Sequence, residues 1–243
     1  MKITAVLLHY YRERTENIAK IVENLKNGSR SPDKIIIFNN NPEMVYPNIK
    51  GLTVINSSKN YGGRGRFPIA FLEPSDYYYF LDDDVITHKN TIANFLKYAK
   101  DGCCYGYWGK IVNPKVDRLY ETGSQYFSKK ITKPQEVDLL VGEGTFFVSH
   151  LALRRMLGTE KILLKEGYEF GREEDLILSM SNRSFAIPAN VSKDEHHSSI
   201  NRGGVAYCNQ PGHWGLRNRM TKRLYPIRRL ADTISVSDKF NVK

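Results

Sequence analysis

Short apolar runs alternate with amphipathic stretches along the first half of the chain. Each run is bounded by polar or turn-forming residues, which is typical of buried strands. The predicted strands are residues 3–9, 34–38, 52–56 and 77–81. Between the first two, residues 15–25 place apolar side chains at helical spacing, and a second helix is expected over 91–99. Strands that alternate with helices in this way predict an α/β fold.

The second half of the chain shows a more mixed pattern. Residues 103–133 contain many Tyr, Gly and Lys residues and predict short strands joined by loops. An apolar strand is expected after Gly142-Glu143-Gly144-Thr145, and helices are expected around 151–157 and 173–180. A further strand is predicted over 185–191. A helix from Leu216 onward is predicted to be interrupted near Pro226.

The composition indicates one large domain, or one domain with an appendage. The chain has 243 residues, of which 41% are hydrophobic, so it can bury a substantial core. Its apolar runs are far too short to cross a bilayer, and a strand-like pattern starts where a signal peptide would lie. Cys103 and Cys104 are adjacent and Cys208 is isolated, which is no disulfide framework. We therefore expect a cytoplasmic setting, unless the chain belongs to a longer protein.

The net charge of +10 indicates an anionic partner without naming it. Nucleic acid, an anionic membrane surface and a nucleotide diphosphate all satisfy that requirement. Much of the excess charge lies in the C-terminal tail, away from the acidic residues considered next. The tail carries Arg217, Arg219, Lys222, Arg223, Arg228 and Arg229.

Three adjacent carboxylates, Asp82, Asp83 and Asp84, follow the aromatic strand at residues 77–81. They repel one another, so a folded protein rarely gathers them without a compensating cation. Mg²⁺ and Mn²⁺ prefer oxygen ligands and leave room for substrate phosphates. A solvated acidic turn is the alternative, and the tripeptide alone supports both readings about equally.

Two more polar segments follow predicted strands. One is the glycine-rich loop, which reads Asn60-Tyr61-Gly62-Gly63-Arg64-Gly65-Arg66, and the other is residues 9–14. Ligands of open α/β sheets bind beyond the carboxyl ends of the strands. Because the aspartates and both segments fall at such ends, their coincidence favours a functional site.

The order of these motifs resembles that of GT-A-fold glycosyltransferases of family 2. The glycine-rich loop is most similar to that of the galactofuranosyltransferase branch, and the sharpest matches are residues 82–84 and 173–175. The resemblance implies a Rossmann-like fold with a mixed, mostly parallel central sheet flanked by helices. It implies a catalytic domain over 1–215, with a nucleotide-binding half at about 1–100 and an acceptor-binding half at about 101–215. A basic helical tail over 216–243 follows.

The resemblance also implies a divalent cation, Mn²⁺ or Mg²⁺. Asp82 and Asp84 are its expected ligands, and Asp83 is expected nearer the donor ribose or sugar. A third ligand in such enzymes is often a histidine some distance after the catalytic acid, where His196 and His197 stand. A surface position is the favoured reading for at least one of these two histidines.

Asp175 matches the position of the family's general base, which takes the proton of the acceptor hydroxyl, and Glu174 is the weaker candidate. Acidic residues in a first helical turn also serve ordinary capping chemistry, which is the structural alternative. A carboxylate base without a second nucleophile implies a single displacement and inversion at the anomeric carbon.

A larger set of residues is expected to contact the donor. They are His9, Tyr10, Tyr11, Arg12, Asn39, Asn60, Gly62, Gly63, Arg64, Arg66 and Gly144. A tyrosine after the first strand stacks on a nucleobase or belongs to the core, and both readings stay open. Asn39 stands where many relatives carry an acidic residue, which leaves the nucleobase undecided. Arg64 and Arg66 reach a diphosphate if the glycines let the backbone come close, and a flexible basic loop is the alternative.

The hypothesis that follows is a metal-dependent, inverting glycosyltransferase. It takes a sugar from a nucleotide-sugar donor, expected to be a UDP-sugar, to a hydroxyl of a glycan, glycolipid or glycoprotein. A nucleotidyltransferase acting on a sugar phosphate is the first alternative, although the chain has no P-loop. A basic nucleic-acid-binding protein is the second, but the acidic cluster argues against it, so no nucleic acid is expected. The basic tail predicts peripheral contact with an anionic membrane, or a helix packed on the catalytic domain.

Overall fold

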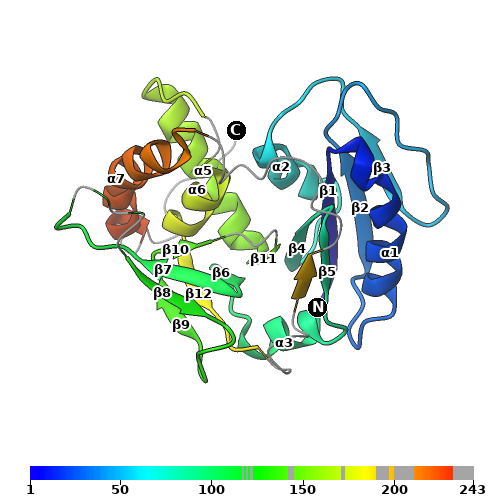
Figure 1. The fold of residues 1–243 in the computed structure, drawn as a ribbon, viewed down its shortest axis with the longest axis horizontal. Helices are drawn as coiled ribbons and strands as arrows, with labels where there is room; N and C mark the ends of the chain where they lie inside the picture. The colour runs from blue at the N-terminus through cyan, green and yellow to red at the C-terminus, as the bar shows by residue number, and fades with distance from the viewer. Residues whose placement is uncertain are drawn as a thin grey trace, which may run out of the picture.

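The computed structural model describes residues 1–116, 118, 120, 123–141, 145–170, 173–189, 197–199 and 211–231, with 197–199 and 227–231 by backbone alone. Its centre is an eight-stranded sheet in the order β3-β2-β1-β4-β11-β6-β12-β9 (Figure 1). The strands are β1 (Ile3–His9), β2 (Lys34–Asn39), β3 (Thr53–Asn56), β4 (Tyr77–Asp82), β6 (Cys103–Gly106), β9 (Gln135–Val137), β11 (Thr145–Ser149) and β12 (Arg183–Ala186).

The sheet is mixed and mostly parallel, as predicted. β3, β2, β1 and β4 run parallel to one another, and β12 runs parallel to β6. β11 lies antiparallel to both β4 and β6, and β9 is antiparallel to β12. The four strands predicted in the first half each lie within one residue of an observed strand. The α/β class is therefore confirmed.

Helices cover both faces of this sheet. They are η1 (Arg12–Arg14), α1 (Thr15–Lys26), η2 (Gly63–Gly65), α2 (Arg66–Ala70), α3 (Thr91–Tyr98), α5 (His150–Lys165), α6 (Glu174–Met180) and α7 (His213–Ala231). α1 and α3 pack on one face, whereas α2, α5 and α6 pack on the other. Two small sheets complete the described fold. One contains β10 (Leu139–Leu140), β7 (Trp108–Ile111) and β8 (Ser124–Phe127), and the other contains β13 (His197–Ser199) and β5 (Val85–Thr87).

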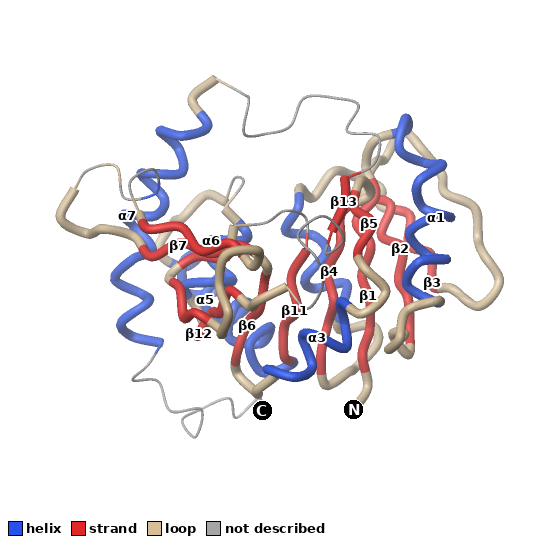
Figure 2. The backbone as a smooth tube through the Cα atoms, turned by 60° about the horizontal axis from the view of Figure 1, so that its bottom comes forward, coloured by secondary structure: helices blue, strands red, loops and turns tan. Residues whose placement is uncertain are grey.

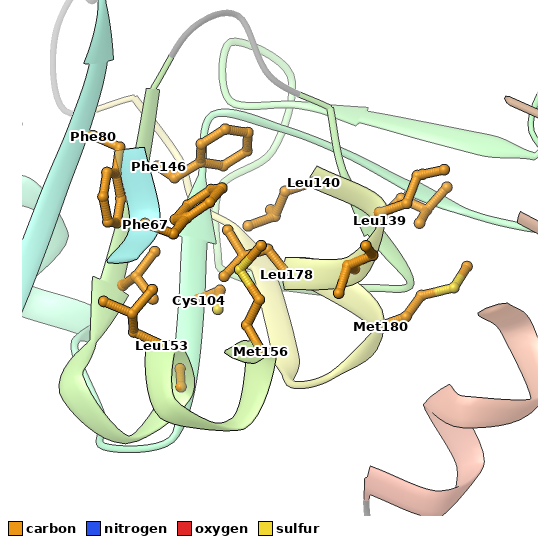
Figure 3. Close-up of a cluster of buried hydrophobic side chains, with 14 of the residues drawn as sticks. Phe67, Phe80, Cys104, Leu139, Leu140, Phe146, Leu153, Met156, Leu178 and Met180 are labelled. Carbon is orange, nitrogen blue, oxygen red and sulfur yellow. The ribbon is translucent and has the colours of Figure 1, made fainter. Parts of the chain in front are cut away.

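Alternating side chains of the central strands feed two separate hydrophobic clusters. In β4, Tyr78 and Phe80 join the cluster under α2, α5 and α6, while Tyr79 and Leu81 join the cluster under α1 and α3. Phe67 of α2 meets Phe80 edge-on, with 4.7 Å between ring centroids (Figure 3). Helices cover both faces of the sheet, and ligands of open α/β sheets bind beyond the carboxyl ends of the strands.

Two elements predicted between residues 151 and 191 differ from the observed ones. The helix expected around 151–157 is longer, spanning His150–Lys165, and Ser149 begins it by accepting a hydrogen bond from the Ala152 N–H. The strand expected over 185–191 is instead Arg183–Ala186, because Pro188 has no N–H to donate to a ladder. Residues 190 and 191 lie outside the described part of the chain.

α7 packs against α6 rather than standing apart from the domain (Figure 1). Met220 and Leu224 on its inner side belong to the core cluster of α5 and α6, and its outer side carries Arg219, Lys222 and Arg223.

The expected interruption near Pro226 is wrong, since the helix runs through this residue, which lies close to its C-terminal end. Within the described segments, no helix is long and apolar enough to cross a membrane. The division of the chain at residue 215 stays a prediction.

Candidate active site

The carboxyl ends of the parallel strands bring polar residues to one edge of the sheet. His9 at the end of β1 is paired with Asn39 of β2, which is paired in turn with Asn56 of β3. Asp82 at the end of β4 pairs with Leu8, one residue before His9. The structure therefore brings together the strand-end residues that the sequence pattern singled out.

Asp83 is the buried member of the acidic triplet, with only 3% of the residue exposed. Its Oδ2 accepts hydrogen bonds from His9 Nδ1 at 2.8 Å and from the Tyr10 N–H at 3.0 Å, and its Oδ1 accepts from Arg14 Nη1 at 3.0 Å. Burial alone would raise the pKa of Asp83, but these donors lower it overall. Both oxygens are thus bonded within the protein, where they tie the end of β4 to the loop after β1.

Asp82 and Asp84 face outward, and each has an arginine beside it. Arg66 Nη1 lies 2.6 Å from Asp82 Oδ1, and Arg14 Nη1 lies 3.2 Å from Asp84 Oδ2. The Asp82 side chain is 34% exposed and that of Asp84 is 19% exposed. Internal cations therefore offset the repulsion between the carboxylates while leaving both within reach of a ligand.

The two outward carboxylates suit a divalent cation held partly by a substrate. Among the described residues, no group of three or more His, Cys, Asp or Glu side chains could hold a metal ion. Asp82 Oδ1 is buried and lies 2.6 Å from Arg66 Nη1, so a cation would reach Asp82 through the exposed part of its side chain, and Mg²⁺-type sites often use one or two carboxylates plus substrate phosphates. His196 lies outside the described residues. The backbone of His197 lies on β13, paired with Thr87 of β5 just after the triplet (Figure 2).

Asn39 and Asn41 fasten the loops around the predicted nucleobase site. Asn39 is buried, and its Nδ2 donates to Met44 O and to Asn56 Oδ1. Its Oδ1 accepts from the Asn41 N–H, and Asn41 Nδ2 donates to Tyr10 O at 2.8 Å. The amide of Asn39 is therefore bonded on both sides by the protein.

Asn40, which was not among the predicted site residues, anchors the glycine-rich loop. It is buried, and its Nδ2 donates to Asn60 Oδ1 at 2.9 Å and to Gly62 O at 3.1 Å. Its Oδ1 accepts from the Tyr61 N–H at 2.9 Å. Asn60 Oδ1 also accepts from the Gly62 N–H, which closes the turn where Gly62 adopts a φ of +68°. The sequence signal for this anchor was the run of three asparagines at the end of β2. We call the hydrogen bonds of Asn40 to residues 60–62 the Asn40 latch.

The tyrosines after β1 are partly exposed and lie together. The Tyr10 and Tyr11 rings meet edge-on at 5.2 Å, and the Arg14 guanidinium lies 4.6 Å from the Tyr11 centroid. Arg12 is exposed and donates through Nη2 to Glu43 O. His9 differs from this group, because it is fully buried against Asp83.

The glycine-rich loop touches the acidic start of α6. A Cβ atom at Gly63 would stand 2.2 Å from Glu174 Oε1, so any larger residue would displace the Glu174 carboxylate or the loop. Arg66 Nε donates to Gly63 O at 2.9 Å while its Nη1 faces Asp82. Arg66 thus connects the loop to the end of β4 beside Glu174.

Glu174 and Asp175 occupy the first turn of α6, as predicted. Burial and the neighbouring Asp175 raise the pKa of Glu174, and Arg66 and Arg217 oppose that shift. Asp175 is held by Arg217 of α7, whose Nη1 and Nη2 donate to Oδ1 at 2.6 Å and Oδ2 at 2.5 Å. Gly144, expected beside the sugar, lies outside the described residues.

Glu160 of α5 is a further acidic residue near this turn, and no motif in the sequence marked it. Burial raises its pKa to about 7, Arg64 opposes the shift, and Glu173 and Glu174 add to it. Arg64 stacks over the Phe170 ring at 4.4 Å. The cations of the loop therefore face carboxylates from both α5 and α6.

Residues 5–163 match the family model described as glycosyl transferase family 2. The chain belongs to this family. The family that the motif order suggested is thereby confirmed, and the protein is a glycosyltransferase rather than either alternative considered above. The matched segment includes Asp82 and Asp84 but ends before Glu174 and Asp175.

Solved structures support a GT-A fold for this glycosyltransferase. The chain is similar to S. aureus TarS 1-349 in complex with UDP-GlcNAc, with a TM-score of 0.56, 15% identity, and coverage of 98% of this chain and 68% of that one. The same fragment in complex with UDP gives a TM-score of 0.51 at 14% identity, with 98% and 67% covered. The match spans 39% of the longer TarS structure. No curated protein matches the chain by sequence, and the galactofuranosyltransferase branch is not confirmed.

Proposed function

We propose that this family 2 glycosyltransferase moves a sugar from a nucleotide diphosphate sugar to a hydroxyl of a glycan, glycolipid or glycoprotein, with inversion. The contact between Gly63 and Glu174 carries the proposal, because it joins the loop beside Asp82 to the turn that holds Asp175. A UDP-sugar is the first donor to test, since the similar TarS structure holds UDP-GlcNAc.

In this proposal the donor diphosphate lies between the acidic triplet and the glycine-rich loop. Asp82 and Asp84 would hold Mn²⁺ or Mg²⁺, which when bound offsets the charge of the leaving diphosphate. Arg66 now faces Asp82, and a phosphate offers its guanidinium a second anionic partner. The backbone of Gly62 and Arg64 is proposed to line the rest of the diphosphate site. His196 or His197 remains the candidate third ligand.

We assign the predicted nucleoside contacts in two groups. His9, Asp83 and Asn39 are bonded within the protein and are best understood as residues that position the loops. Tyr10 and Tyr11 are partly exposed and keep ring surface for a nucleobase. Stacking on a ring face tolerates any nucleobase. This fits a chain that carries Asn39 where many relatives have an acidic residue.

On the acceptor side, Asp175 is the proposed general base. A carboxylate there takes the proton of the acceptor hydroxyl while that oxygen attacks the anomeric carbon from the side opposite the diphosphate. Glu174, whose pKa is raised, is placed to donate a hydrogen bond to a sugar or phosphate oxygen when protonated. Gly144 is proposed to border the sugar.

The experiment is a donor panel with and without a divalent cation. The protein is incubated with UDP-, GDP- and dTDP-sugars, with MnCl₂, MgCl₂ or EDTA, and release of the nucleoside diphosphate is measured. One class of donor should be cleaved in a cation-dependent manner. Asp84→Asn should abolish cleavage, while Glu16→Gln, at an exposed position, should not. Cleavage of no donor, or full activity of Asp84→Asn, would contradict the proposal.

A further inference from the structure

α7 is anchored to α6 by a buried polar contact as well as by apolar packing. Met220, Thr221 and Leu224 are buried on its inner side, and Arg217 lies on the same side with 4% of the residue exposed. A guanidinium removed from water is costly unless a carboxylate and further acceptors satisfy it. The structure provides that carboxylate from Asp175, the proposed base.

The geometry between Arg217 and Asp175 is that of a two-pronged ion pair. Each terminal nitrogen of the guanidinium donates to a different carboxylate oxygen, at 2.6 and 2.5 Å, and this planar match fixes the rotation of the carboxylate. The Leu176 N–H adds a donor to Asp175 Oδ1 at 3.0 Å. The Asp175 side chain is left only 14% exposed.

Tyr120 also contacts the Arg217 guanidinium. The Arg217 Cζ atom lies 4.6 Å from the Tyr120 ring centroid, and Arg217 Nη2 donates to Tyr120 Oη at 3.4 Å. The neighbouring Asn218 accepts a hydrogen bond from the Tyr120 N–H at 2.9 Å. The guanidinium is therefore fixed in position before any substrate arrives.

An ionised carboxylate offers about four positions for hydrogen-bond donors. Arg217 occupies two of those positions on Asp175, and the Leu176 N–H occupies a third. Among the described residues no other donor reaches this carboxylate, so a position remains for one hydroxyl, in a direction that the other three partners define. The same contacts that bury the carboxylate thus select the approach of the acceptor oxygen.

We propose that Arg217 is a positioning residue for catalysis, which makes α7 part of the active site of this glycosyltransferase. It acts through Asp175 and touches no substrate atom itself. The inference rests on the proposed function of Asp175. It extends the site beyond the segment matched by the family model, because residues 164–243 lie outside that match.

The test compares Arg217→Ala with a variant that loosens α7 without touching Asp175. Leu224→Ala removes core packing from the same helix, and Arg219→Ala removes an exposed cation. For the preferred donor and acceptor, kcat, KM and the melting temperature are measured for each variant, with and without tens of millimolar guanidinium. Arg217→Ala should lose about 100-fold in kcat with little change in donor KM.

Guanidinium distinguishes positioning from a merely structural contact. Added guanidinium should restore kcat of Arg217→Ala by about tenfold or more, because it re-forms the two-pronged contact. It should not raise the rates of Leu224→Ala or Arg219→Ala. A folded Arg217→Ala with wild-type kcat, or equal rescue of the Leu224 variant, would overturn the proposal.

If Arg217→Ala does not fold, Arg217→Lys decides the question, since an ammonium keeps the charge but matches only one oxygen well. Its kcat should fall about tenfold at an unchanged melting temperature, and an unchanged kcat would reject the positioning role. Failure of this inference is distinct from failure of the proposed function. In the first case the wild type transfers sugar and the folded Arg217 variants match it, whereas in the second the wild type uses no donor.

Discussion

Gly63 of the glycine-rich loop lies so close to Glu174 of α6 that a Cβ atom at position 63 would stand 2.2 Å from Glu174 Oε1. The two residues belong to opposite halves of the chain. Their contact places Arg66 and Asp82 beside the first turn of α6, next to Asp175. The proposed donor and acceptor sides therefore meet at this contact.

Replacing Gly63 with alanine should separate the loop from α6. The added methyl group displaces the Glu174 carboxylate or the loop backbone, so we expect kcat/KM to fall by about 10–100-fold with a folded protein. Gly215→Ala is the control, because Gly215 is exposed in α7 and the nearest side-chain atom of the described residues to its Cβ would be Arg219 Nη1, at 3.7 Å. Steady-state kinetics of both variants check this, and wild-type activity in Gly63→Ala would count against the functional contact.

Asn40→Ala should release the glycine-rich loop from the end of β2. Loss of three hydrogen bonds from one buried amide should cost about 1–3 kcal/mol in the free energy of unfolding. We also expect a higher KM for the donor, because the loop no longer has a fixed conformation. Asn48→Ala, at an exposed position in the following loop, serves as the control. Equal donor KM in the two variants would show that the latch is dispensable for binding.

Much of the architecture follows from local patterns in the sequence. The strands ending at His9, Asn39 and Asp82 were predictable because buried parallel strands are continuous apolar runs that stop at polar residues. Because these strands are parallel, their carboxyl ends lie at the same edge of the sheet, so the meeting of these three residues was also predictable. The start of α6 was predictable too, because Glu174 and Asp175 suit a first helical turn.

Other features depend on contacts between distant segments and leave no local signal. The burial of Asp83 comes from His9 and Arg14, which fold over it, and nothing in the acidic triplet itself shows which carboxylate turns inward. The partnership of Arg217 with Asp175 depends on how α7 docks, and a run of basic residues looks the same on a free tail. Those roles required the tertiary structure.

Asp83→Asn should destabilise the fold at neutral pH. The substitution removes the buried carboxylate that accepts from His9, the Tyr10 N–H and Arg14, and leaves only Asp84 as a carboxylate beside Arg14 among the described residues, at a cost of about 3 kcal/mol. The pKa of Asp83 is lower in the folded state, so its contribution is present above the unfolded pKa and is lost as the pH falls through the folded value. Urea unfolding should therefore show a steeper loss of stability toward acid pH in the wild type than in Asp83→Asn. Parallel pH profiles would contradict the assignment.

Glu160→Gln should stabilise the protein at alkaline pH. The pKa of Glu160 is raised to about 7 in the folded state, above its value in an unfolded chain, so the folded state binds the proton more tightly. Stability linked to this group is present at acid pH and falls as the pH rises toward and through about 7. The melting temperature of Glu160→Gln should exceed that of the wild type at about pH 8 and differ little at about pH 5. Glu166→Gln, at the exposed end of the same helix, should show no such dependence, and an equal shift at both pH values in Glu160→Gln would argue against the burial effect.

In the proposed mechanism, Asp175 deprotonates the acceptor hydroxyl during transfer from a nucleotide sugar. The most direct measurement is single-turnover transfer by the wild type and Asp175→Asn, with donor binding measured by calorimetry and the anomeric configuration of the product by NMR. We predict inversion in the wild type, and in Asp175→Asn donor affinity within about threefold of wild type with a transfer rate lower by about 10²–10⁴-fold. Retention of configuration, or transfer at the wild-type rate by a folded Asp175→Asn, would show that Asp175 is not the general base of an inverting transfer.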